Sequence, residues 1–369
     1  MKSVKLFLLL MFIPAFLHSQ ELNVYDLTCE HRTNPLGIDA LQPRLSWKIK
    51  STGNNVMQTA YSIRVSTDQR FSVSGIVWST GRVASGESVL VPYQGKDLKP
   101  GQRYYWQVMV WDNRGKSSKW SGTAFWEAGL LNQENWKASW IEMDSDTNRY
   151  APSPHFRKEF NIDKNVAKAV VYVTSHGFYE LHLNGRKVGD QVLTPGWTSY
   201  GKRLQYQVYD VTDQVVKGKN AVGAVLGDGW YRGTLAWGNN WAIYGKRLGL
   251  LMQLKITYTD GTESMIVTDG TWKCSNDGAI RMNDIYNGET YDATRKLTGW
   301  NLPDYNESNW KAVKTGSYKN NIIASQGAPI RKIGEIKPVK VFRSPGGSLL
   351  VDMGQNMVGW IRLKVSGAK

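Results

Sequence analysis

The chain has 369 residues, enough for two or three domains that each bury a core of their own. Its formal net charge is +15, but the Lys and Arg residues are spread along the chain and form no basic run, which argues against a nucleic-acid-binding protein. The only two cysteines, Cys29 and Cys274, exclude a disulfide framework and are expected to be buried thiols.

The first residues have the form of a secretory signal peptide. Lys2 and Lys5 supply positive charge ahead of the apolar run 6–17, and Ser19 is a small residue where a signal peptidase could cut. The run is too short for a membrane span. We therefore expect a signal peptide at 1–19 and a mature chain exported to the periplasm or beyond the cell. For such a protein, the excess of positive charge would favour an acidic polysaccharide as an anionic partner.

Residues 20–130 are expected to form a fibronectin type III-like β-sandwich. Alternating apolar and polar residues mark strands at 44–49, 60–65, 88–91 and 105–111, separated by turn residues. Leu98-Lys-Pro-Gly-Gln-Arg-Tyr104 leads into the last strand in the manner of a tyrosine corner, whose hydroxyl bonds back to the preceding turn. Trp47 is the expected core tryptophan of this domain.

Residues 131–315 are expected to form a jelly-roll β-sandwich. Residues 129–140 suggest a connector, and a series of apolar runs then follows whose number and spacing are typical of that fold. Asn184-Gly185 and Asp260-Gly261 are the strongest hairpin-turn signals in the chain. The apolar runs lie at 156–160, 169–173, 178–183, 204–209, 221–226, 250–256 and 264–267.

Glycines and aromatic residues are concentrated in the segment 227–244. Its opening, Gly-Asp-Gly-Trp-Tyr-Arg-Gly, lacks the Lys-Ser/Thr of a phosphate-binding loop. Two interpretations remain open: the aromatic rings stack on sugars while an acid bonds their hydroxyls, or the rings plug one end of the sandwich. The candidate carbohydrate-binding residues are Asp228, Trp230, Tyr231, Trp237 and Trp241.

Three acids, Asp284, Glu289 and Asp292, lie within nine positions of one another. Paired carboxylates hydrolyse a glycoside only when they face each other across the bond at a defined gap, and closeness in sequence does not give that geometry. We favour a polar loop that fixes one end of the sandwich or holds a cation such as Ca²⁺. The histidines have no metal-ligand spacing, and the pattern requires no cofactor.

Residues 316–369 are expected to be a linker followed by the first strands of a truncated third β domain. The runs at 348–354 and 360–365 could pair with each other. Two or three strands cannot bury a core alone, so we expect the opening of a larger domain.

The sequence resembles the N-terminal modules of bacterial α-L-rhamnosidases from about residue 22 to its end. The resemblance is collinear, and its specificity comes from the order of the motifs. They are Arg44-Leu-Ser-Trp47, the strand 104–112, Phe178-Tyr-Glu-Leu-His-Leu-Asn-Gly185, Leu193-Thr-Pro-Gly-Trp-Thr198, Gly227-Asp-Gly-Trp-Tyr-Arg-Gly233, Asn287-Gly-Glu-Thr-Tyr-Asp-Ala293 and Met353-Gly-Gln-Asn-Met-Val-Gly-Trp360.

The resemblance implies an inverting glycoside hydrolase that removes terminal α-L-rhamnose from glycosides or plant polysaccharides with glutamates of an α/α barrel. No long helical periodicity that could build the barrel is present in the sequence, so no catalytic residue is assigned. The resemblance also implies modules in which an aromatic residue and a cation contact rhamnose, with Trp230 and Asp228 as candidates. We therefore expect accessory or sugar-binding modules that take a rhamnose-containing glycan. The alternative is a free-standing carbohydrate-binding or adhesion protein without hydrolase activity.

Overall fold

The computed structural model describes residues 21–144, 147–235, 240–318, 321–364 and 366 of the chain. The predicted signal peptide at 1–19 and the candidate Trp237 lie outside these residues. Strands make up 43% of the chain and helices 3%, which confirms the all-β prediction. The chain divides into two compact units, Met1–Ala128 (unit 1) and Gly129–Lys369 (unit 2). Within the described ranges, no helix has both the length and the apolar character needed to cross a membrane.

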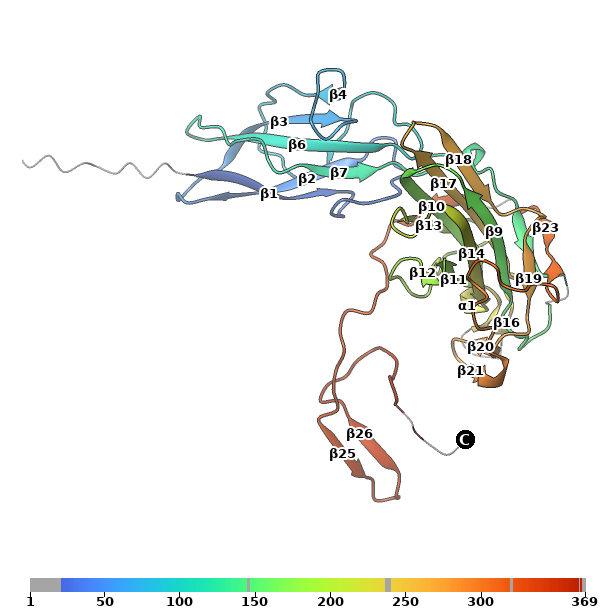
Figure 1. The fold of residues 1–369 in the computed structure, drawn as a ribbon. Coiled ribbons are helices and arrows are strands. Elements are labelled where there is room, and N and C mark those ends of the chain that lie inside the picture. Colours follow the sequence, from blue (N-terminus) through green and yellow to red (C-terminus); the bar gives the residue numbers. More distant parts are fainter. Residues whose placement is uncertain (1–20, 145–146, 236–239, 319–320, 365, 367–369) are drawn as a thin grey trace, which may run out of the picture. The chain divides into compact units, whose positions relative to one another are not determined.

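Unit 1 is a sandwich of two antiparallel sheets (Figure 1). Fully buried tryptophans, among them Trp47, Trp106 and Trp126, fill its core. The predicted core role of Trp47 is therefore confirmed. One sheet has the order β1 (Leu22–Cys29), β2 (Arg44–Ser51), β5 (Val91–Pro92), and the other β4 (Ile76–Ser79), β3 (Gln58–Ser66), β6 (Arg103–Asp112), β7 (Ala124–Glu127).

The predicted tyrosine corner is present at the start of β6. The backbone N–H of Lys99 donates to the Tyr104 hydroxyl over 2.8 Å, and the Tyr104 ring stacks on Trp126. The strand predicted at 88–91 is wrong in extent, because only Val91–Pro92 pairs as β5. Leu90 has a φ of 56°, outside the extended region, and its N–H donates to the side chain of Ser46 in place of a ladder partner.

Unit 2 is built on two larger sheets. Their strands match the seven apolar runs predicted from the sequence. The larger sheet has the order β23 (Lys314–Gly316), β8 (Trp140–Glu142), β17 (Gly249–Tyr258), β10 (Val166–His176), β13 (Leu204–Asp210), β24 (Ile322–Ala324), with β18 (Glu263–Val267) also paired to β17. The smaller sheet has the order β12 (Arg186–Lys187), β11 (Phe178–Leu183), β14 (Gly218–Gly227), β9 (His155–Ile162), β19 (Lys273–Ser275), β22 (Lys311–Ala312).

The larger sheet of unit 2 is apolar on both faces. Successive residues of β10 belong to different clusters: Val171 and Val173 face the core between the two sheets, whereas Val170 and Tyr172 face a second cluster on the opposite side. This second cluster is rich in tyrosine and tryptophan, and loops cover it in place of a sheet. Trp230, Tyr231 and Tyr244 of the candidate aromatic segment belong to that covering layer.

The connector expected at 129–140 and the start of the linker expected from 316 both belong to unit 2. Leu130 and Trp140 lie in the second cluster, and residues 311–318 and 321–324 supply β22, β23 and β24. β24 runs parallel to β13, and Ile322 and Ala324 are buried there. β22 extends the smaller sheet by pairing with β19, and β23 extends the larger sheet by pairing with β8. Ile322 and Ala324 of β24 join the second cluster with Leu130 and Trp140.

Pairs of strands that are neighbours in sequence complete the fold. Asn184-Gly185 joins β11 to β12 and Asp260-Gly261 joins β17 to β18, which confirms both turn predictions. The sequence suggested that 348–354 and 360–365 could pair, but the strand at 349–352 does not pair with 360–364. It forms β26 (Leu349–Asp352) and pairs with β25 (Lys340–Arg343), the strand just before it in the chain. β15 (Thr234–Leu235) pairs with β16 (Asn240–Trp241), and β20 (Ile280–Asp284) pairs with β21 (Gly288–Tyr291), both antiparallel.

Candidate functional site

The predicted aromatic loop lies at one end of unit 2, where α1 (Gly229–Arg232), β16 and the β20–β21 hairpin are neighbours (Figure 1). α1 is a single turn directly after β14. Gly229 has a φ of +52°, and a Cβ there would lie 2.7 Å from the Phe178 ring, so only glycine fits. This close approach sets Trp230 edge-on to Phe178, with ring centroids 4.9 Å apart.

A buried ion pair closes the same turn. Arg232 donates from Nε and Nη2 to Oδ1 of Asp228 over 2.8 and 2.5 Å, and the two side chains are 0% and 1% exposed. The N–H of Asp228 donates to Asn283 of β20, which ties the turn to the neighbouring hairpin. The Asp228 carboxylate is therefore engaged in holding the turn and is not available at the surface for a sugar hydroxyl.

Four aromatic side chains, Phe178, Trp197, Trp230 and Tyr244, form what we call the aromatic platform. Trp197 is 51% exposed and lies nearly parallel to Trp230, with an interplanar angle of 9° and centroids 5.6 Å apart. Its Nε1 donates to the Tyr244 hydroxyl over 3.3 Å. The platform thus presents indole surface to solvent from a fixed arrangement of rings.

Tyr231, the neighbour of Trp230, points the other way into the second cluster. Its ring stacks on His176 at 4.6 Å, and His176 in turn stacks on Trp140 at 4.2 Å. Burial, with a further contribution from the charge of Glu142, raises the pKa of Tyr231 to about 12. Tyr231 therefore fits the interpretation in which the aromatic rings plug one end of the sandwich, whereas Trp230 remains partly exposed to solvent.

The other predicted aromatic residues are placed less centrally. Trp241 lies in β16, is half-buried, and has the Lys246 ammonium 5.6 Å from its ring centroid. Trp197 was missed by the sequence prediction, although it lies in the turn Pro195-Gly196-Trp197 between two strands. A tryptophan in a polar, glycine-containing turn is the signal that could have identified it.

The three candidate acids do not converge on one site. Asp284 is buried and accepts backbone N–H groups of Thr234, Tyr286 and Asn287 over 2.7 to 3.0 Å. Burial alone would raise the pKa of Asp284, but these hydrogen bonds bring it below its usual value. Glu289 is exposed, and Asp292 accepts the N–H of Thr294 to cap a 3₁₀ turn. In the described part of the chain, no group of three or more His, Cys, Asp or Glu residues could hold a metal ion.

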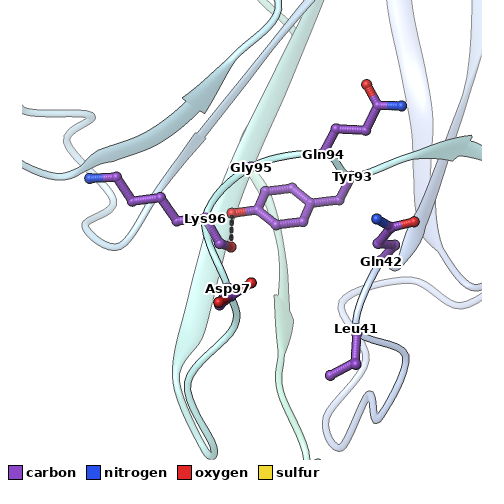
Figure 2. A pocket seen from close by; sticks show the side chains of 7 residues that line it. All are labelled: Leu41, Gln42, Tyr93, Gln94, Gly95, Lys96 and Asp97. Carbon is purple, nitrogen blue, oxygen red and sulfur yellow. Dashed lines mark hydrogen bonds between the residues drawn. The ribbon is translucent and has the colours of Figure 1, made fainter.

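A separate hollow of about 480 Å³ lies on unit 1 (Figure 2). The Tyr93 hydroxyl donates to the carbonyl of Lys96 over 2.9 Å, and burial raises the pKa of Tyr93 to about 12. The polar side chains around it are exposed, so the hollow has no buried charge to orient a ligand. It is lined by Leu41, Gln42, Tyr93, Gln94, Gly95, Lys96 and Asp97.

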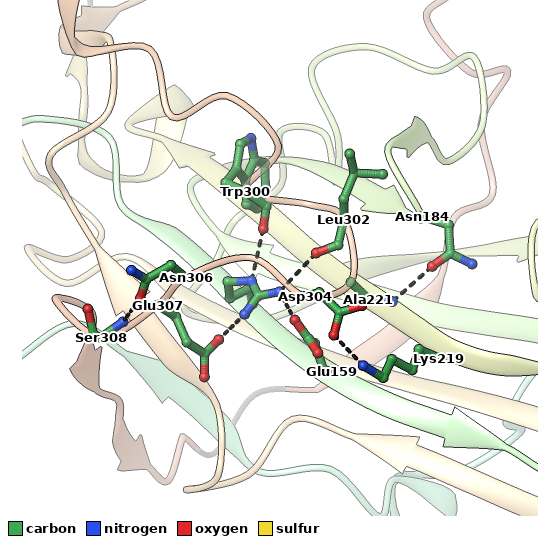
Figure 3. Close-up of polar contacts among 11 residues, drawn as sticks. Glu159, Asn184, Lys219, Ala221, Trp300, Leu302, Asp304, Asn306, Glu307 and Ser308 are labelled. Atoms are coloured by element: carbon green, nitrogen blue, oxygen red, sulfur yellow. Dashed lines mark hydrogen bonds and ion pairs between the residues drawn. The ribbon is translucent and has the colours of Figure 1, made fainter.

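A polar cluster around Arg157 holds a loop against the smaller sheet of unit 2 (Figure 3). Arg157 is 1% exposed and donates to the carbonyls of Trp300 and Leu302 over 2.9 and 3.0 Å. It also pairs with Glu159 and Glu307. The cluster positions the loop and has no feature that points to a ligand.

Two models of known protein families match the chain. Residues 24–132 match the Rha78A-like, N-terminal immunoglobulin domain, and residues 164–334 match the α-L-rhamnosidase N-terminal domain. The first match covers most of unit 1 and ends four residues beyond it, and the second lies within unit 2.

Similar proteins of known name agree with these matches. An α-L-rhamnosidase of Formosa agariphila is 38% identical over 365 residues, which is 91% of this chain and 38% of that protein. The solved α-L-rhamnosidase from Dictyoglumus thermophilum is 38% identical with a TM-score of 0.82, over 90% of this chain and 38% of that one. The Streptomyces avermitilis α-L-rhamnosidase, solved with L-rhamnose, is 27% identical with a TM-score of 0.85. The match covers 91% of this chain and 49% of that one. The chain therefore spans less than half the length of each of these relatives.

Proposed function

The chain belongs to the α-L-rhamnosidase family through its N-terminal domains, and from this premise we propose that it is part of an exported enzyme that hydrolyses terminal α-L-rhamnose. The substrates are glycosides or plant polysaccharides, and the two units of this chain act as accessory modules. Export is supported by the signal-peptide pattern at 1–19. Within the pair of units, unit 2 binds sugar.

The observation that carries sugar binding is the stacked pair of Trp197 and Trp230. Indole faces bind the C–H faces of sugar rings, and an exposed tryptophan keeps apolar surface in water that a ligand could bury. Trp197 is half exposed although it stacks on Trp230 and hydrogen-bonds to Tyr244. The rings are therefore held in place before a ligand arrives, which lowers the entropic cost of binding.

No catalytic residue is assigned among the described acids. Inverting hydrolysis needs one carboxylic acid and one carboxylate on opposite sides of the glycosidic bond, about 6.5–9.5 Å apart. Asp228 is paired to Arg232, Asp284 accepts three backbone amides, and Asp292 caps its own turn. The role proposed for this chain is accordingly binding and positioning.

Calorimetry of the chain without residues 1–19 tests the binding role. Titration with L-rhamnose and with rhamnosylated oligosaccharides should release heat that Trp197→Ala and Trp230→Ala each abolish. Trp120→Ala, at a half-buried tryptophan of unit 1, is the matched control and should keep full binding. Circular dichroism of every variant establishes that it is folded.

Two results would count against the proposal. If no rhamnose-containing ligand gives heat, or if the folded Trp230→Ala variant binds as well as the parent chain, the platform has no sugar-binding role. Release of nitrophenol from a nitrophenyl rhamnoside by the purified chain would instead contradict the exclusion of catalytic groups from it.

A further inference from the structure

The sequence Tyr-Gly-Lys-Arg-Leu occurs twice in unit 2, at 200–204 and at 244–248. The leucines at the end of each copy, Leu204 and Leu248, are buried. The lysines, Lys202 and Lys246, are exposed in both. Each copy therefore anchors a turn by its last residue and presents cationic residues beside the anchor.

The two copies meet beside the aromatic platform. The rings of Tyr200 and Tyr244 pack edge to face with centroids 4.9 Å apart. Tyr244 is a platform residue and accepts the indole N–H of Trp197. Tyr200 packs edge-on against Tyr231, the residue next to Trp230. The platform thus takes Trp197 from the loop just before the first turn and Tyr244 from the second turn, two segments some forty positions apart.

These turns carry positive charge that their own segments do not neutralise. No Asp or Glu occurs in residues 191–209 or 229–259. Lys202, Arg203 and Lys246 are exposed, and none of them has an ion-pair partner among the residues that the structure describes. Lys246 lies instead over the Trp241 ring, so a cation and an indole are presented together.

Arg247 is the exception among these cations. Its Nη1 lies 4.0 Å from Oε2 of Glu142 and donates to the backbone carbonyl of Asp144 over 3.2 Å. Glu142 in turn accepts the hydroxyl of Tyr318. Glu142 is thus engaged with Arg247 and Tyr318, and the carboxylate of Asp144 pairs with Lys314. Lys202, Arg203 and Lys246 remain for a ligand.

We propose that the two turns and the aromatic platform form one binding site for a glycan that carries an anionic sugar residue, such as a uronate. A neutral ring stacks on the indoles, and the anionic group of an adjacent residue accepts hydrogen bonds from Lys202, Arg203 or Lys246. Hydrogen bonds between ionised partners are about twice as strong as neutral ones, which gives the cations their selectivity. This inference rests on the proposed sugar binding by unit 2 and specifies the substrate class of that same site.

The test compares ligands that differ only in charge. Three ligands are titrated into the chain without residues 1–19: short oligosaccharides that alternate a neutral sugar with galacturonate, the same oligosaccharides after carboxyl reduction, and the reduced oligosaccharides carrying a sulfate ester. We expect the carboxyl-reduced ligand to bind about tenfold more weakly, and the affinity of the charged ligand to fall as salt rises. Lys202→Gln, Arg203→Gln and Lys246→Gln should each weaken the charged ligand several-fold and leave L-rhamnose binding unchanged.

Lys217→Gln is the matched control for these substitutions. Lys217 is exposed and precedes β14, at the opposite end of that strand from Asp228. Its replacement lowers the net charge by the same amount and should leave the affinity unchanged.

The outcomes separate this inference from the proposed function. Equal affinity for charged and carboxyl-reduced ligands, with no effect of the glutamine variants, overturns the anionic assignment and leaves sugar binding in place. An equal effect of Lys217→Gln also overturns it, because net charge alone would then account for the binding. Preference for the sulfated ligand supports the site and identifies its anion as a sulfate ester. Absence of binding to every probe, including L-rhamnose, overturns both proposals.

Discussion

Arg232 makes two hydrogen bonds to a single carboxylate oxygen of Asp228, and both side chains are almost completely shielded from water. The pair spans one helical turn, whose second residue is Trp230 of the aromatic platform. The orientation of an exposed binding residue therefore depends on a buried ion pair that no ligand touches.

Removing one member of this pair should destabilise unit 2. Asp228→Asn leaves the Arg232 guanidinium buried without its counter-charge, and breaking a buried pair from one side costs about 3–5 kcal/mol. Urea unfolding followed by tryptophan fluorescence measures the loss. Asp260→Asn is the matched control, because the Asp260–Lys164 pair is half exposed and should cost at most about 1 kcal/mol. Equal losses in the two variants would contradict the structural role of the buried pair.

The repeated turns offer a second matched comparison, at their glycines. A Cβ on Gly245 would lie 2.1 Å from the Tyr231 hydroxyl, whereas a Cβ on Gly201 would meet nothing within 4 Å. Tyr231 cannot move aside, because its ring is stacked on His176 and packed against Tyr200. Gly245→Ala should therefore cost about 1–3 kcal/mol of unfolding free energy. Gly201→Ala should stay within about 1 kcal/mol of the parent, and chemical denaturation of both variants checks the difference.

The features of unit 1 that could be predicted from the sequence are those that depend on neighbouring residues. The tyrosine corner requires Lys99 and Tyr104, which are five positions apart, and the alternation around Trp47 shows which face of its strand is buried. The sequence did not predict that the strand at 88–91 is shortened. Leu90 leaves the extended region because its N–H donates to the side chain of Ser46, which is far away in sequence.

The candidate site was less predictable because it depends on contacts between residues that are far apart in sequence. The sequence identifies the aromatic loop but does not show that Trp230 faces outward and Tyr231 inward, which is decided by the φ of Gly229 and the pairing of Asp228. Trp197 joins Trp230 from another loop, and no local pattern connects the two. β23 and β24 likewise pair with strands more than a hundred positions earlier.

Arg157 should control the order of the loop that it holds against the smaller sheet. Arg157→Met removes the donors to the carbonyls of Trp300 and Leu302 and leaves Glu307 without its partner. We expect a loss of about 2–4 kcal/mol, below the full cost of a buried pair because the glutamates are about one-third exposed. Hydrogen exchange should become faster at the amides of 300–308.

An exposed pair supplies the control for that measurement. Arg186 pairs with Asp213, and both side chains are more than half exposed. Arg186→Met should change the unfolding free energy by less than about 1 kcal/mol and leave exchange at 300–308 unchanged. If the two methionine variants have the same exchange at 300–308, Arg157 does not order the loop.

Glu180 should make part of the stability of unit 2 sensitive to acid. Hydrogen bonds from His182 and then from Lys187, opposed by partial burial, lower the pKa of Glu180 from 4.5 to about 2. Because the pKa is depressed in the folded chain, the stabilisation is complete above about pH 4.5 and is lost as the pH falls towards 2. The difference in unfolding free energy between the parent and Glu180→Gln should therefore shrink over that range. It should remain below about 1 kcal/mol, since the side chain is 44% exposed.

Both cysteines should be unreactive while the chain is folded. Cys29 and Cys274 are free and buried, and burial raises the pKa of Cys274 to about 11 and that of Cys29 further still. The thiolate is the reactive form, so at pH 8 only on the order of one in a thousand Cys274 side chains is ionised. A coloured disulfide reagent added at pH 8 should therefore label neither thiol within minutes and both after unfolding in guanidinium. Cys274→Ser assigns the signals, because it should halve the final absorbance. Rapid labelling of the folded parent chain would mean that at least one thiol is open to solvent.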